Sequence, residues 1–144
     1  MKHLLTLSLL LCILLSANAQ EKRPLTGDDI LKWNRISEKM ISNNGEYIVY
    51  KTEPWKGDPT LYISDKKGKG LASFDFSTKA SITFDSKFIV ITVQQPADTI
   101  RQLKLKKTKK DEMPKDELAI YNLETGNIDK IPNIVSNKIP GEWG

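Results

Sequence analysis

The sequence predicts an all-β fold in which two related groups of short antiparallel strands follow one another. Short runs rich in β-branched and aromatic residues alternate with turn residues, a pattern typical of sandwiches, barrels and propellers. Residues 41–51 and residues 82–92 also align in register at an offset of 41 residues. This offset lies within the span of about 40–45 residues that a four-stranded propeller blade occupies.

The first 19 residues read as a secretory signal peptide. Lys2 and His3 give a positive start, residues 4–15 are mostly apolar, and residues 16–19 supply small side chains in the A-x-A cleavage pattern. The apolar run is shorter than the roughly 20 residues that a membrane-spanning helix needs. We therefore expect cleavage after Ala19, an exported (periplasmic or secreted) mature chain and no stable membrane anchor. The single Cys and the single His of the chain lie in this segment, so the mature chain is expected to contain neither.

A short helix is predicted shortly after the signal peptide. Thr26 is a favourable N-cap residue, and Asp29 stands three residues later, close to a capping box. The pattern predicts a helix from about Gly27 to Asn34, with Ile30 and Trp33 on one face.

The strands are predicted from apolar runs that are bounded by turn residues. Asn44-Gly45 is a strong hairpin turn pair, and glycine-containing segments at residues 54–59, 66–70 and 124–126 separate the later runs. The predicted strands lie at residues 47–50, 61–63, 88–93, 118–121 and 128–131, and the last of them is expected to end before Pro132.

A second match supports the repeat. Residues 61–65 with Gly68 echo residues 118–122 with Gly126, and the larger offset requires an insertion in the second unit. Two blades cannot close a ring or bury both of their faces, so the sequence predicts a partial β-propeller of about two blades, interrupted within an array. The organisation that we expect is a signal peptide at residues 1–19, an arm with a short helix at residues 20–36, and an incomplete propeller at residues 37–144 with a lysine-rich insertion at about residues 94–117.

The mature sequence carries no recognisable catalytic or ligand-binding constellation. A Ser-His-Asp triad needs an imidazole, and no G-x-S-x-G elbow occurs. The turn at residues 66–70 lacks the spacing of a phosphate-binding loop. Adjacent acidic residues lack metal-ligand spacing and are interpreted as cap and surface charges, namely Asp28-Asp29, Asp111-Glu112 and Asp116-Glu117. We expect no catalytic residue, no cofactor-binding residue and no metal ligand in this chain.

The positive charge of the chain is concentrated in one segment. The net charge is +4, and six cations lie between Arg101 and Lys110, in a stretch that favours a helix from Asp98 to about Lys107. Such a segment can contact an anionic membrane surface, nucleic acid or an acidic partner. Charge runs usually form solvated segments, and no aromatic residues interleave for base stacking. We interpret this segment as a solvated insertion and expect no nucleic-acid partner.

Three tryptophans remain to be placed, at positions 33, 55 and 143. They can line a ligand pocket, or they can fill the core and the blade interfaces. Large aromatic side chains dominate cores and interfaces, so the second role is predicted.

The order and spacing of several weak motifs carry a resemblance to a known family. The motifs are residues 22–26, the helix near Trp33, residues 41–45, the lysine-rich insertion running into residues 111–116, residues 118–126 and Ile131-Pro132. Together they resemble the opening of exported bacterial peptidases of the prolyl oligopeptidase family. Members of that family combine an N-terminal β-propeller with a C-terminal α/β-hydrolase domain that carries Ser, Asp and His. None of those catalytic positions has a counterpart here, and Asn43 and Phe84 stand where proline is common in such turns.

The resemblance implies a non-catalytic propeller segment that gates or size-selects peptide substrates in a full-length serine peptidase. The expected partners are the remaining propeller blades, the hydrolase domain and the peptide substrates. An exported propeller-type protein-interaction module without a peptidase role is the alternative, and a small self-contained exported β-domain is a third reading. The reading frame downstream of this chain distinguishes them.

Overall fold

The structure is a computed structural model that describes residues 23–141, so the predicted signal peptide and Trp143 lie outside the described residues. Eight strands form two four-stranded antiparallel sheets, each with its strands in sequence order. The first sheet contains β1 (Asn34–Ile41), β2 (Tyr47–Pro54), β3 (Thr60–Asp65) and β4 (Gly70–Asp75), and the second contains β5 (Ser77–Ile82), β6 (Phe88–Val93), β7 (Asp116–Asn122) and β8 (Ile128–Ile134). The remaining elements are α2 (Gly27–Leu31), α3 (Ala97–Leu105) and the 3-10 turn η1 (Lys110–Glu112).

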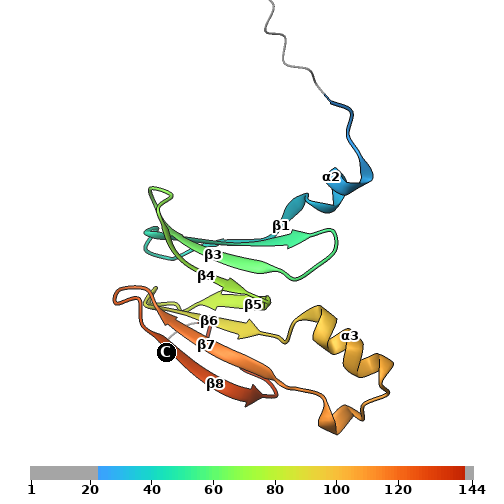
Figure 1. The fold of residues 1–144 in the computed structure, drawn as a ribbon. Helices are drawn as coiled ribbons and strands as arrows, with labels where there is room; N and C mark the ends of the chain where they lie inside the picture. Colours follow the sequence, from blue (N-terminus) through green and yellow to red (C-terminus); the bar gives the residue numbers. More distant parts are fainter. Residues whose placement is uncertain (1–22, 142–144) are drawn as a thin grey trace, which may run out of the picture.

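The two sheets lie one over the other, with α2 and α3 projecting from the stack (Figure 1). This arrangement confirms the predicted all-β fold and the partial β-propeller, because each sheet is a four-stranded meander and the two follow one another in the chain. The five predicted strands lie within β2, β3, β6, β7 and β8. The strands β1, β4 and β5 were not predicted one by one, because polar residues interrupt their apolar patterns.

Two predicted boundaries are wrong. The first helix ends at Leu31 instead of about Asn34, because Asn34 already pairs with Pro54 in the first sheet. The last strand continues through Pro132 to Ile134. Proline is tolerated there because β8 is an edge strand and the β7–β8 register shifts at this point.

The first turn of each sheet is built by the same hydrogen bonds at positions 41 residues apart. Ser42 Oγ donates to Asn44 Oδ1 over 2.6 Å, and Thr83 Oγ1 donates to Asp85 Oδ1 over 2.6 Å. Each hydroxyl also accepts a bond from the backbone N–H five residues later, at 3.0 and 3.1 Å. The repeat in the sequence is therefore a repeat in local structure.

The turn between the third and fourth strands repeats as well. Asp65 Oδ1 accepts bonds of 2.9 and 2.8 Å from two backbone N–H groups of the following turn. Asn122 Oδ1 does the same in the second sheet, with two bonds of 2.9 Å. Gly68 and Gly126 adopt φ values of 82° and 75°, which glycine reaches without strain.

The core lies between the two sheets. Alternation along the strands and cross-strand pairing place most buried apolar residues of each sheet on the face that meets the other sheet, while Leu118 lies on the opposite face of the second sheet. Phe74 and Tyr121 contact each other edge to face across this interface, with ring centroids 5.9 Å apart. The buried cluster consists of Val49, Leu61, Ile63 and Phe74 from the first sheet and Ile89, Ile91, Ala119, Tyr121 and Leu123 from the second.

A single residue, Phe76, joins the last strand of the first sheet to the first strand of the second, with φ at 60°. At its start β5 lies beside β4, where Ser77 Oγ donates to the carbonyl oxygen of Phe74 over 2.8 Å. At its far end β5 reaches the β1–β2 turn, where Asn43 Nδ2 donates to the carbonyl oxygen of Phe84 over 3.0 Å. The strand itself therefore crosses from the β4 edge of the first sheet to its β1 edge, and no long linker is needed.

Candidate functional site

The acidic pairs singled out in the sequence lie apart from one another. Asp29 accepts two bonds from the Arg23 guanidinium, at 2.6 and 2.7 Å, and bonds from the backbone N–H and the hydroxyl of Thr26. The Arg23 bonds, followed by those from Thr26, lower the pKa of Asp29 far below its usual value. Glu117 pairs with Lys130 across β7 and β8 at 3.1 Å. Between residues 23 and 141, no three His, Cys, Asp or Glu side chains gather as metal ligands would.

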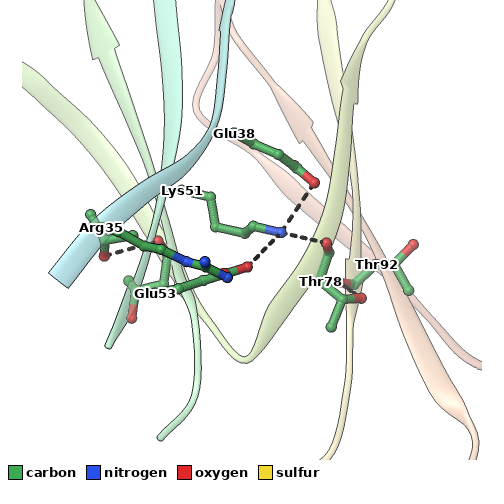
Figure 2. Close-up of polar contacts among 8 residues, drawn as sticks. Arg35, Glu38, Lys51, Glu53, Thr78 and Thr92 are labelled. Atoms are coloured by element: carbon green, nitrogen blue, oxygen red, sulfur yellow. Dashed lines mark hydrogen bonds and ion pairs between the residues drawn. The ribbon is translucent and has the colours of Figure 1, made fainter. Parts of the chain in front are cut away.

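The most concentrated set of charges lies between the two sheets, around Lys51 on β2. The Lys51 side chain is only 6% exposed. Its amino group donates to Glu38 Oε1 over 3.1 Å and to the Thr78 carbonyl oxygen over 2.8 Å, and it lies 3.4 Å from Glu53 Oε1. Figure 2 shows the amino group pointing from the first sheet toward the backbone of β5. We call Lys51, Glu38, Glu53 and the Thr78 carbonyl the Lys51 cluster.

Arg35 on β1 extends this cluster to the surface. Its Nη2 and Nε donate to Glu53 Oε2 at 2.8 and 3.2 Å. The Arg35 bonds, with smaller contributions from Ser37 and Lys51, outweigh burial and lower the pKa of Glu53. Two cations and two carboxylates therefore balance one another at this point.

The Lys51 cluster has the properties of a structural contact between sheets. Three oxygens surround the three N–H donors of an ammonium group, which leaves no free direction for a substrate. Removing one partner of a buried ion pair costs about 3–5 kcal/mol, because the remaining charge is left uncompensated. Glu38 Oε2 is buried and has no hydrogen-bond partner among the described residues, so the cluster already carries one unsatisfied atom.

Sequence reasoning missed this cluster. The available signal was a lysine placed within an apolar strand, at the position that Thr92 occupies in the second repeat. A lysine in such a place is rarely buried without a partner. Glu53 lies two residues after Lys51 on the same strand, but Glu38 and Thr78 lie 13 residues before it and 27 residues after it, so the sequence alone did not bring the whole cluster together.

The lysine-rich segment forms the connection between β6 and β7, with α3 followed by η1. The start of the helix contacts the loop between β2 and β3, where Asp58 Oδ1 accepts a bond of 2.9 Å from the backbone N–H of Ala97. A cavity of about 510 Å³ lies beneath it, lined on the helix side by Ile100, Arg101 and Lys104. All six cations between Arg101 and Lys110 are nonetheless exposed, as expected for a solvated segment.

Two of the tryptophans differ from the prediction. Trp33 and Trp55 are 57% and 81% exposed, so neither fills the core between the sheets. Trp33 directly precedes β1 and Trp55 directly follows β2, so both lie outside the strands at one end of the first sheet. With Ile30 and Pro54 they line a groove of about 430 Å³, which also places Ile30 and Trp33 on one side as predicted.

No protein-family model matches the chain, and no curated protein matches it. Among solved structures, the chain is similar to the β-propeller domain of the Trilobed protease from Pyrococcus furiosus, which is described as having an open velcro topology. The identity is 19% over 69% of this chain and 28% of that chain, with a TM-score of 0.47. The chain thus spans little more than a quarter of that structure, and the likeness is too distant to carry a conclusion about activity.

The class of protein follows from the chain's own geometry. Two consecutive four-stranded meanders with matching turns, packed face to face, are neighbouring blades of a propeller. Within residues 23–141, neither helix has the length and apolar character needed to cross a bilayer.

Proposed function

We propose that the chain is the non-catalytic propeller segment of an exported serine peptidase of the prolyl oligopeptidase type, in which the blades restrict the peptides that reach a separate hydrolase domain. The observation that supports this proposal is the pair of tandem blades joined by the Lys51 cluster. A wall of packed blades excludes large molecules by its shape, and it requires no reactive side chain of its own. The order of the sequence motifs, which resembles that of the prolyl oligopeptidase family, supports the link to a peptidase.

In this proposal the work of the segment is mechanical. A passage formed by blades admits a peptide only if the blades stay together while the peptide passes. The interface between the first two blades is held by the buried apolar cluster and by the ion pairs of Lys51. Loosening that interface should therefore alter substrate size selection more than chemistry at the hydrolase site.

The first test is the genomic reading frame that contains the chain. We expect it to continue beyond residue 144 into further four-stranded repeats, and then into a hydrolase domain with a G-x-S-x-G elbow and Asp and His partners. A frame that continues into blades without a hydrolase domain favours the interaction-module alternative. A frame that ends after residue 144 overturns the proposal.

The second test uses the longer protein and compares cleavage of a short and a long peptide with the same scissile site. Lys51→Met should raise the cleavage of the long peptide relative to the short one, because it weakens the contact between blades. Thr92→Val, at the equivalent position of the second blade, is the matched control and should leave the ratio unchanged. A lowered melting temperature in Lys51→Met would show that the contact between the blades is weaker. If the ratio of long-peptide to short-peptide cleavage is nevertheless unchanged, size selection by these blades is contradicted.

A further inference from the structure

The cavity beneath α3 lies at the ends of the strands, between parts of both sheets. Its volume of about 510 Å³ is within the range of about 300–1,000 Å³ that is typical of ligand sites. Figure 1 shows α3 beyond the ends of the strands, on the same side as the loop between β2 and β3. The bond from the Ala97 N–H to Asp58 Oδ1 joins these two segments. All of the lining residues lie between positions 58 and 105, so the cavity is formed within the part of the chain that the structure describes.

The helix wall of this cavity is cationic and apolar at the same time. Ile100 and Arg101 are neighbours on α3, and Lys104 and Leu105 repeat this pair one turn later. Residues four positions apart lie on the same side of a helix, so both pairs line the cavity. Neither Arg101 nor Lys104 forms an ion pair within residues 23–141. Their charges are therefore available to an anionic ligand.

The opposite side of the cavity adds apolar and amide groups. Phe76, which connects the two sheets, supplies apolar surface, and Gln94 and Gln95 follow directly after β6. Their side-chain amides can both donate and accept hydrogen bonds. The one carboxylate among the lining residues, that of Asp58, already accepts the bond from the start of α3. The lining thus favours a ligand that combines an anionic group, an apolar group and amide-like polar groups.

We propose that this cavity binds the C-terminal end of a peptide whose last side chain is apolar. Arg101 and Lys104 pair with the terminal carboxylate through charge-assisted hydrogen bonds, while Leu105 and Phe76 contact the last side chain. The two glutamine amides bond to the peptide groups that precede it. A terminal residue carries its carboxylate and its side chain on one Cα, which matches the adjacent cation and apolar residue in each pair of the helix. This proposal does not depend on the peptidase relation, because binding is measured without cleavage.

The test measures the binding of fluorescent peptides to the full chain by fluorescence anisotropy. The first peptide has five residues, an uncharged dye at its N-terminus and a terminal leucine with a free carboxylate. The second is the same peptide with a C-terminal amide, and the third is the amidated peptide with a glutamate before the leucine. We expect the first peptide to bind about tenfold more tightly than either amidated peptide. Equal binding of the first peptide and either of the others would overturn the proposal, as would no binding of the first peptide.

A pair of double variants locates the binding in the cavity. Arg101→Gln with Lys104→Gln removes both cations that line it and should weaken binding of the first peptide about tenfold. Lys106→Gln with Lys109→Gln removes two charges from the same segment at residues that do not line the cavity. In about 0.15 M salt, where exposed charges more than about 8 Å apart are largely screened, this control should change the affinity less than about twofold. All four residues are exposed, so both variants should fold, and equal losses of affinity would overturn the proposal.

A final variant tests the apolar half of the site. Leu105 lines the cavity and is 68% exposed, so Leu105→Ser should leave the far-ultraviolet circular dichroism and the melting temperature unchanged. It should weaken binding of the peptide that ends in leucine about threefold, because less apolar surface is removed from water. Binding of a peptide that ends in glycine with a free carboxylate should be the same in this variant and in the wild-type chain. If the leucine peptide bound equally to both proteins, the proposal would be overturned.

Discussion

The first and second sheets are built by the same turns, yet their faces differ in what they contact. In both sheets a side-chain hydroxyl and an Asn or Asp close the first turn with bonds of the same length. The side chains on the faces of the two sheets differ. Lys51 lies between two carboxylates and the backbone of β5, whereas its counterpart Thr92 carries no charge. The comparison shows that the turn residues determine how the strands of a blade connect, whereas the side chains on the faces of a blade determine which surface it packs against.

The largest effect is expected at the aromatic residue of the interface. Phe74→Ala removes a buried ring that contacts Tyr121 and should lower the free energy of unfolding by about 3–5 kcal/mol. Ile131→Ala, at the matching position on β8, on the side of the second sheet that points away from the first, should cost only about 1 kcal/mol because its side chain is already half exposed. Urea unfolding at low protein concentration measures both. Equal losses in the two variants would show that the two faces do not differ in burial.

The Lys51 cluster should come next. Lys51→Met leaves Glu38 and Glu53 without their shared cation and should cost about 3 kcal/mol. Thr92→Val changes the equivalent residue without removing a charge and should cost about 1 kcal/mol. Adding Glu38→Gln to Lys51→Met should restore part of the loss, because it removes the carboxylate that was left uncompensated. A double variant less stable than Lys51→Met would contradict the ion-pair explanation.

The first turns offer a smaller contrast. Gly45 adopts φ 71° with no atom within 4 Å of an added Cβ, so Gly45→Ala should cost about 1–2 kcal/mol through backbone strain alone. Ser86 occupies the equivalent position at φ 59° and accepts a bond from the backbone N–H of Asn44. In Ser86→Gly the relief of strain and the loss of that bond should nearly cancel, with a change within about 0.5 kcal/mol. Thermal melting of both variants checks the asymmetry.

The smallest effect is expected in the pH dependence of the second turn. The Thr83 hydroxyl, followed by the Lys87 backbone N–H, lowers the pKa of Asp85 below its usual 3.8. A carboxyl with a lowered folded-state pKa stabilises the protein fully above its unfolded pKa, and this stabilisation is lost as the pH falls through the folded value. Asp85→Asn copies the Asn44 turn and should therefore keep stability at pH 7 while reducing the loss at about pH 3. A variant with the same loss on acidification as the wild-type chain would exclude Asp85 as a contributor.

Much of the fold could be predicted because its signals are local. The turn at Asn44-Gly45, the β-branched runs and the offset between the repeats each lie within a few residues of what they determine. The end of the first helix and the continuation of β8 past Pro132 were predicted wrongly, because pairing with a neighbouring strand decided both. The exposed Trp33 and Trp55 were misplaced for the same reason, since composition alone does not say which edge of a sheet remains open.

The sequence by itself determined five of the eight strands in the described residues, the turns and the fact that one unit occurs twice, because short apolar runs and turn residues are local signals. Only the tertiary structure decided that β5 crosses the first sheet, that Lys51 meets Glu38 and Thr78, and which side of each sheet is covered. Those features depend on contacts between residues far apart in the chain, and the alternation of side chains along a strand does not state which face will find a partner.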